Sequence, residues 1–259
     1  MMLVPALKPS HVMAVWYRNF LVWRKLVVAS MLGNFGDPFL YLLGLGYGLG
    51  LYIGEMGGIP YMAFLASGIL CSSAMNTATF EGLYSAFTRM NQQGTWEGIL
   101  ATPLRIQEVV AGELVWAATK SLISGTAILI VAGLLGGIQS WETAWMVVPV
   151  IFLIGLAFAG PALVVSAIAP SYDFFLYYFT LAVTPMFLFC GVFYPIDALP
   201  EFAQLLAQGL PLTHAVALVR PLLTELPLTQ PFLHMTVLGT YAVVGYIIAS
   251  HLAARRLLR

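Results

Sequence analysis

Long apolar runs, separated by short polar stretches, occupy most of the chain. These runs approach or exceed the roughly 20 residues that a helix needs to cross a lipid bilayer. Backbone amides in hydrocarbon must be paired within their own segment, and a barrel would require short alternating strands that the pattern does not contain. The pattern therefore predicts six spanning helices, at about 30–53, 60–87, 109–136, 143–168, 174–194 and 232–252.

An amphipathic pattern precedes the first of these runs, at about 9–27. One face carries cations and the opposite face is mainly aromatic: the first set is His11, Arg18 and Lys25, and the second is Trp16, Phe20, Trp23 and Val27. This favours a helix in the membrane interface, with its aromatic face toward hydrocarbon and its cations toward anionic headgroups. The alternative, a first span that begins early, is disfavoured because each charge at mid-span costs about 2.5–3.5 kcal/mol. We expect no cleaved signal peptide.

The stretch between the fifth and sixth runs is apolar but interrupted by prolines, so it is too broken to cross the membrane. Two pieces, FAQLLAQ and HAVALVR, are apolar enough to form two short outer helices. Irregular backbone at membrane depth is tolerated only where protein covers it or water reaches it. We therefore expect this segment to cover an exit, with five lid residues: Tyr194, Pro195, Asp197, Pro200 and Pro211.

The composition agrees with a single membrane domain over residues 1–259. The chain is 60% hydrophobic and 8% charged, and its mean hydropathy is +0.90, far from the values of soluble domains. A formal charge of zero argues against a nucleic-acid partner. Cys71 and Cys190 both fall inside apolar runs, so we expect buried thiols and neither a disulfide framework nor a metal site.

Basic residues are distributed unevenly between the two sides that six spans define. One side holds Lys8, Arg18, Arg24, Lys25, Arg89, Arg105, Arg255, Arg256 and Arg259, whereas the other holds only Arg220. The positive-inside rule makes the first side cytoplasmic, together with both termini.

The chain carries no recognisable device for ATP binding or catalysis. A P-loop ends in Gly-Lys-Ser/Thr, but the lysines are Lys8, Lys25 and Lys120, and Thr119 precedes the last of them. The histidines are scattered and form no convincing group with serine and aspartate. We therefore expect neither a bound cofactor nor enzymatic activity of the chain alone.

The second and third apolar runs contain three charged residues: Glu81, Glu113 and Lys120. Such groups are functional suspects at membrane depth. The alternative is structural: Lys120 pairs with Glu81 across two helices, or extends its stem along apolar surface toward water. A proton-coupled secondary transporter could use these charges, but such folds usually show internal repeats, and this chain shows none between residues 1–130 and 131–259.

Glycine recurs in the first apolar run. Gly44, Gly46, Gly48 and Gly50 give two overlapping frames of small residues four apart, a spacing that lets another helix approach closely. The neighbour could belong to this chain or to a second copy.

A polar stretch, RMNQQGTWEGILATPLRIQEVVAGEL at residues 89–114, separates the second and third runs. The positive-inside count places it in the cytosol. A solvated loop would explain its charges but not an exposed tryptophan.

Several stretches together resemble the membrane-spanning subunits of ABC-2 type exporters, and within them the branch of nodulation-factor (lipo-oligosaccharide) export permeases. The stretches are DPFLYLLGLGYGLG at 37–50, ATFEGLYSAFTRM at 78–90, TWEGILATPL at 95–104, GELVWAATKS at 112–121, APSYD at 169–173 and GVFYPIDALP at 191–200. The resemblance implies a homodimer of six-helix subunits in the bacterial cytoplasmic (inner) membrane. It also implies two copies of a separate ABC ATPase subunit on the cytosolic side, which would hold ATP and Mg.

The resemblance gives the polar stretch a role as the coupling element. It implies a short helix at about Gln92–Leu100, ended at Thr102-Pro103, that docks into a groove of the ATPase. Trp96, exposed on this chain alone, would be the buried anchor in that groove, because aromatic residues are favoured as interface hot spots. The set also includes Arg89, Gln93, Glu97 and Arg105, of which the charged members would form a polar rim.

The function implied is ATP-driven outward transport of an amphipathic glycoconjugate or lipid-like substrate. Drug or antibiotic efflux is the alternative within the same class, because the same kind of subunit serves both cargoes. A purely structural membrane scaffold is a third and weaker alternative.

Overall fold

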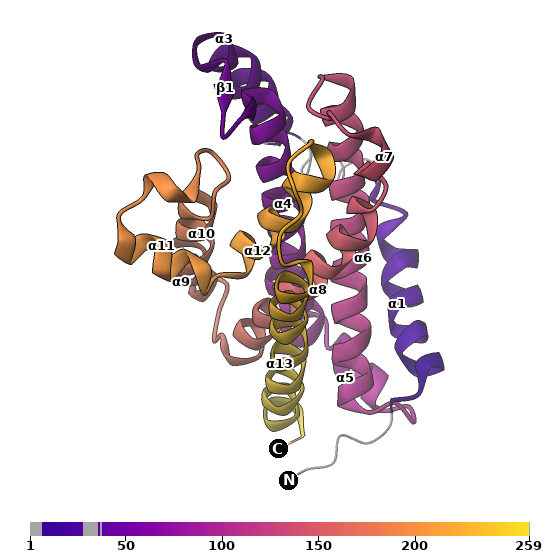
Figure 1. Ribbon diagram of the computed structural model, residues 1–259. Helices are drawn as coiled ribbons and strands as arrows, with labels where there is room; N and C mark the ends of the chain where they lie inside the picture. Colours follow the sequence, from indigo (N-terminus) through magenta and orange to yellow (C-terminus); the bar gives the residue numbers. More distant parts are fainter. Residues whose placement is uncertain (1–6, 28–35, 37, 259) are drawn as a thin grey trace.

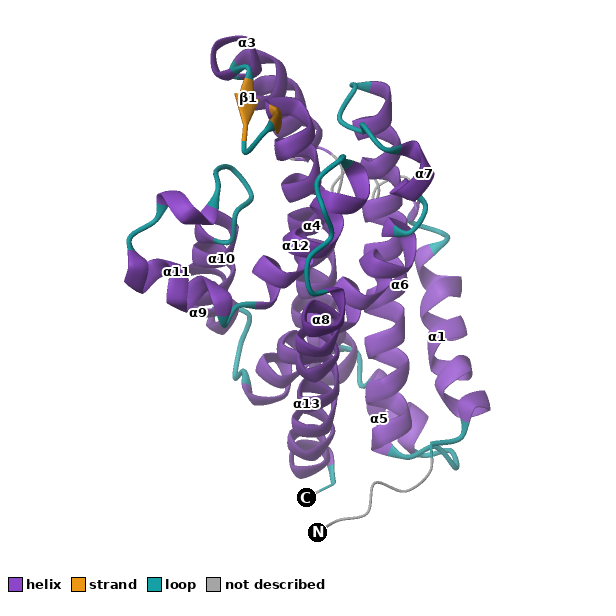
Figure 2. Cartoon of the chain, viewed as in Figure 1, coloured by secondary structure: helices purple, strands orange, loops and turns teal. Residues whose placement is uncertain are grey.

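The computed structural model describes residues 7–27, 36 and 38–258. Figure 2 shows helices almost throughout, with one short hairpin. The first half contains α1 (Pro9–Trp23), η1 (Leu42–Tyr47), α3 (Gly50–Ile53), β1 (Glu55–Met56), β2 (Ile59–Pro60), α4 (Tyr61–Phe80), η2 (Glu81–Ser85), η3 (Thr88–Gln92), α5 (Thr95–Leu100) and α6 (Ile106–Leu134). The second half contains α7 (Trp141–Ala144), α8 (Val147–Ile168), α9 (Phe174–Tyr178), η4 (Phe179–Val183), α10 (Thr184–Phe189), η5 (Ile196–Ala198), α11 (Glu201–Gln208), α12 (Pro211–Leu223) and α13 (Pro231–Leu257).

The central helix is α4, which continues through the π-helical turns η2 and η3 to Gln92. Nearly all of its side chains are buried, and they include small polar ones that find partners inside the helix bundle. Ser67 Oγ donates to the Phe64 carbonyl at 2.8 Å, and the Ser73 and Ser124 hydroxyls lie 3.2 Å apart. Helices α6, α8 and α12 pack around α4, and α13 packs along α8 (Figure 1).

The lengths of the apolar helices set how many can cross a membrane. Within the described residues, four are long and apolar enough: Tyr61–Gln92, Ile106–Leu134, Val147–Ile168 and Pro231–Leu257. The bent pair α11 and α12 could count as a fifth. Pro38–Ile53 and Phe174–Phe189, where we expected the first and fifth spans, are shorter apolar helices. Residues 28–35 and 37 of the first expected span and its approach lie outside the described part of the chain.

Helix α1 runs alongside the first half of α6 (Figure 1). Its aromatic face is turned toward protein: Trp16, Phe20 and Trp23 each place a ring 6.0–6.5 Å from the ring of Trp116 on α6. The Trp16 indole also donates to the Thr119 hydroxyl at 2.9 Å. The expectation that this face points toward hydrocarbon is therefore wrong. The amphipathic pattern was correct, but the apolar partner is a neighbouring helix.

Two helices occupy the Pro-rich segment before α13, and they meet at an angle of 85°. Helix α11 leaves Phe202, Leu205 and Leu206 exposed. Helix α12 is largely buried and packs against α4 and α13. This half of the segment therefore belongs to the core of the chain. Figure 1 shows α9, α10 and α11 to one side of the bundle formed by α4, α6, α8 and α13.

Candidate functional site

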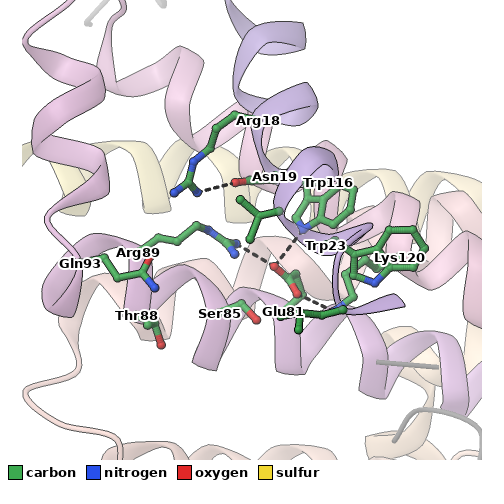
Figure 3. A pocket seen from close by; sticks show the side chains of 12 residues that line it. Arg18, Asn19, Trp23, Glu81, Ser85, Thr88, Arg89, Gln93, Trp116 and Lys120 are labelled. Carbon is green, nitrogen blue, oxygen red and sulfur yellow. Dashed lines mark hydrogen bonds and ion pairs between the residues drawn. The ribbon is translucent and has the colours of Figure 1, made fainter. Parts of the chain in front are cut away.

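A buried ion cluster joins the central helix to α6. Its four members are Glu81 on η2, Arg89 on η3, and Glu113 and Lys120 on α6. Arg89 Nη2 lies 2.8 Å from Glu81 Oε1, and Lys120 Nζ lies 2.8 Å from Glu81 Oε2 (Figure 3). The same Arg89 nitrogen lies 2.5 Å from Glu113 Oε2. The structure therefore contains the Lys120–Glu81 pair, and Arg89 links both carboxylates.

Two indole groups complete the hydrogen bonding of the cluster. Trp116 Nε1 donates to Glu81 Oε1 at 3.0 Å, and Trp96 Nε1 donates to Glu113 Oε1 at 3.2 Å. Every oxygen of both carboxylates then accepts at least one N–H bond. Buried charges are tolerated only when they are paired and hydrogen-bonded in this way. The ion cluster is thus a satisfied network that ties together η2, η3, α5 and α6.

Helix α5 is positioned by a glycine turn at its start. Gly94 has φ +59°, in the left-handed region that glycine adopts without strain, and it turns the chain from η3 into α5. The turn directs Trp96 inward, where it is 2% exposed. Trp96 is therefore bonded within its own chain, and the expectation of an exposed anchor for a partner is wrong.

The other residues that we expected to form the coupling element divide between interior and surface. Arg89 was expected at a polar rim, but the helix extends to Gln92 and carries the guanidinium into the ion cluster. The exposed members form what we call the coupling surface: Gln92, Gln93, Glu97, Thr102, Pro103 and Arg105. Thr102 Oγ1 donates to the Ile99 carbonyl at 2.6 Å, which closes the end of α5.

Sequence reasoning did not single out Glu108, which fixes the beginning of α6. Its carboxylate accepts the Arg105 backbone N–H at 2.9 Å and the Lys8 backbone N–H at 3.2 Å. His11 Nδ1 lies 2.8 Å from the same carboxylate. The available signal was a glutamate three residues after the helix boundary, a spacing typical of helix N-caps.

Arg220 was expected among the outer charges, but the structure places it against α4. It donates to Ser67 Oγ at 3.0 Å, to the Gly191 carbonyl at 2.6 Å and to the Phe64 carbonyl at 3.2 Å, and it stacks 3.6 Å above the Phe64 ring. The contacts join α12, α4 and the loop after α10. The expected lid residues occupy the chain between the loop after α10 and the start of α12: Asp197 and Pro200 are exposed, Tyr194 and Pro195 are half-buried, and Pro211 is buried.

The four glycines of the first apolar run lie on two different faces of their helical segment. A Cβ on Gly46 would meet Met62 on α4 at 2.8 Å, and one on Gly50 would meet Tyr61 at 3.8 Å. Gly44 and Gly48 have no such neighbour within 4 Å in the described part of the chain. One frame of small residues therefore packs within the chain, and the other faces outward.

A family model described as ABC-2 type transporter matches residues 10–223, and the chain belongs to this family. It is thus a membrane-spanning transport subunit, as the sequence motifs predicted. The chain is 47% identical over 247 residues to Nodulation protein J of Rhizobium leguminosarum bv. viciae, with 95% of each chain covered. It is 49% identical to Nodulation protein J of Bradyrhizobium diazoefficiens, over 95% of this chain and 94% of that relative. It is 25% identical to the inner membrane transport permease YadH of Escherichia coli, over 93% and 94% of the two chains.

Proposed function

We propose that this chain is the membrane subunit of an ATP-driven exporter that moves an amphipathic glycoconjugate of the lipo-oligosaccharide type outward across the bacterial inner membrane. The observation that carries the proposal is the 47% identity to Nodulation protein J across 95% of both chains. Six spans, with both termini in the cytoplasm, are part of the proposal. The transporter unit is a homodimer of this chain with two copies of an ABC ATPase subunit, on which ATP and Mg are bound.

The coupling surface is the proposed docking site of the ATPase. Helix α5 is fixed to α6 through Trp96 and Glu113, and Arg89 joins the same glutamate to the central helix. A displacement of α5 would thus pass to both spans, because a hydrogen-bonded buried network moves as one body more readily than a loop does. The ion cluster supports this role because its hydrogen bonds join α5, which carries part of the coupling surface, to both helices.

Helix α11 is proposed to cover the outer end of the transport path. Its exposed Phe202, Leu205 and Leu206 present an apolar surface beside α10, while Asp197 and Glu201 begin the segment with charge. A surface of this composition is suited to an amphipathic cargo or to the outer leaflet. The unpartnered frame at Gly44 and Gly48 is the proposed contact with the second copy.

The test is transport in proteoliposomes that contain this chain and its ATPase partner. We expect ATP-dependent movement of a lipo-oligosaccharide and none of the same oligosaccharide without its acyl chain. An ATPase variant with its P-loop lysine replaced is the control, since it assembles without hydrolysing ATP. Export of hydrophobic drugs but not of the lipo-oligosaccharide would instead support the efflux alternative.

A further inference from the structure

The molecule contains a polar pocket between α1 and the ion cluster, with a volume of about 300 Å³. Figure 3 shows Arg18 and Asn19 of α1 on one side and Glu81 and Arg89 on the other, and Trp116 and Lys120 also line the pocket. We propose that this pocket, called here the headgroup pocket, binds the phosphate of an anionic phospholipid from the cytosolic leaflet. The proposal rests on the orientation given under the proposed function, and it concerns a bound lipid and not the cargo.

The charges around the headgroup pocket leave one cation without an anionic partner. Three cations line the pocket: Arg18, Arg89 and Lys120. Two carboxylates accompany them, that of Glu81, which lines the pocket, and that of Glu113, which is paired with Arg89. The carboxylates are engaged by Arg89, Lys120 and the two indoles. Arg18 forms no ion pair among the described residues, and its hydrogen bonds go to neutral groups: Asn19 Oδ1 at 2.9 Å and Thr95 Oγ1 at 3.3 Å. The spare positive charge favours an anion, and guanidinium groups bind phosphate oxygens strongly.

An unpaired hydrogen-bond donor lies on the same wall. Asn19 is 3% exposed, and its Nδ2 has no hydrogen-bond partner in the part of the chain that the structure describes. A buried donor without an acceptor is costly, so such groups indicate a missing partner. A phosphate bound to Arg18 would bring acceptor oxygens next to this amide, because Arg18 and Asn19 already share a hydrogen bond.

The depth of the headgroup pocket in the membrane agrees with a lipid headgroup. The hydrocarbon core is about 30 Å thick, which corresponds to roughly 20 helical residues at 1.5 Å each. Counted from Tyr61 at the outer end of α4, this distance ends near Glu81, and counted back from Leu134 on α6 it ends near Leu114. The headgroup pocket therefore lies at the inner boundary of the hydrocarbon. Val22 and Leu26 also line it and are exposed, so the first carbons of an acyl chain have an apolar wall.

The experiment is native mass spectrometry of the purified full-length chain. Phosphatidylglycerol and phosphatidylcholine with identical acyl chains are offered at equal concentration. We expect the wild type to retain phosphatidylglycerol preferentially. Arg18→Gln removes the spare charge and should weaken this binding about fivefold, the effect typical of one cation near an anionic lipid surface. Arg24→Gln is the matched control, because Arg24 is an exposed cation on the same segment and does not line the pocket.

A second variant separates lipid binding from a structural role of Asn19. Asn19→Asp keeps the shape of the side chain and gives Arg18 an anionic partner within the chain. If the Arg18 charge did not bind the lipid phosphate, this variant would keep both its thermal stability and its preference for phosphatidylglycerol, which would also overturn the proposal. We expect instead that stability is retained while the preference for phosphatidylglycerol is lost, since the added carboxylate neutralises the spare charge.

Three further results would overturn the proposal. One is equal retention of the two lipids by the wild type, and another is an unchanged lipid preference in Arg18→Gln. The third is displacement of the lipid by excess inorganic phosphate, which would identify a site for soluble anions. None of these measurements uses ATP or cargo, so their failure leaves the export test untouched, and failure of export leaves the lipid result untouched.

Discussion

Arg89 is the residue on which the ion cluster depends most, because it bonds both Glu81 and Glu113. Arg89→Met would leave Glu113 with only the Trp96 indole, and removing one partner of a buried ion pair costs about 3–5 kcal/mol. Lys120→Met should cost less, since Glu81 keeps Arg89 and Trp116. We expect the larger loss of thermal stability in Arg89→Met, measured on the purified chain in detergent.

The control for this comparison is Arg255→Met, because Arg255 is exposed near the end of α13. Its unfolding temperature should stay close to that of the wild type. If Lys120→Met were the more destabilising of the two cluster variants, the central place of Arg89 in the network would be wrong.

Trp96 and Glu97 are adjacent in sequence, but the structure predicts that replacing Trp96 lowers stability and that replacing Glu97 lowers affinity for the ATPase. Trp96→Phe keeps an aromatic ring in the core and removes the N–H bonded to Glu113, which should cost about 1.5–3 kcal/mol of stability because the acceptor is charged. Glu97→Lys reverses a charge on the coupling surface and should weaken ATPase binding at least about tenfold with little loss of stability. Thermal unfolding and light scattering with the ATPase subunit measure the two effects. A loss of ATPase affinity in Trp96→Phe alone would favour the exposed-anchor interpretation.

At the residue scale, the sequence identified the ionisable groups but not all of their partners. Glu81, Glu113 and Lys120 stand out because charges within apolar runs are rare and costly. Arg89 was assigned to a loop because the expected span ended at about 87, whereas the helix continues to Gln92. A shift of a few residues in one boundary therefore moved a side chain from the surface to the interior.

At the scale of elements, the contact between α8 and α13 depends on two glycines. A Cβ on Gly245 would lie 2.6 Å from the carbonyl carbon of Gly160, a distance that packed atoms cannot adopt. Gly245→Leu should therefore separate the helices and lower the unfolding temperature by several degrees or prevent folding. Gly239→Leu is the control on the same helix, since nothing lies within 4 Å of a Cβ there. Equal behaviour of the two variants in thermal unfolding would show that the close approach contributes little.

The apolar pattern predicted where the helices lie along the chain better than it predicted which helices pack together. The pattern predicted apolar segments where α4, α6, α8 and α13 lie, because long runs without charge leave few alternatives. It did not predict that the aromatic face of α1 packs on Trp116, since a protein surface and lipid tails are equally apolar. The prolines indicated a break between α11 and α12, but not the burial of α12.

For the molecule as a whole, the family could be predicted because six short motifs occur in order along one chain. The family model over residues 10–223 confirms that prediction. The headgroup pocket was harder to predict from the sequence, because it combines residues as distant along the chain as Asn19, Arg89 and Lys120. A sequence pattern describes neighbours along a helix, whereas this pocket is produced by the packing of three separate segments.

The orientation of the molecule gives the last prediction, on which the coupling surface, the lid and the headgroup pocket all depend. Cys71 and Cys190 are buried, so Cys71→Ala and Cys190→Ala should provide a cysteine-free background. Glu201→Cys and Glu225→Cys should then react with a membrane-impermeant maleimide in intact spheroplasts, because both positions are exposed and lie on the outer side by the positive-inside rule. Thr102→Cys, exposed on the coupling surface, should react only after permeabilisation. The reverse pattern would place the coupling surface outside the cell, where no ATP-hydrolysing partner could drive transport.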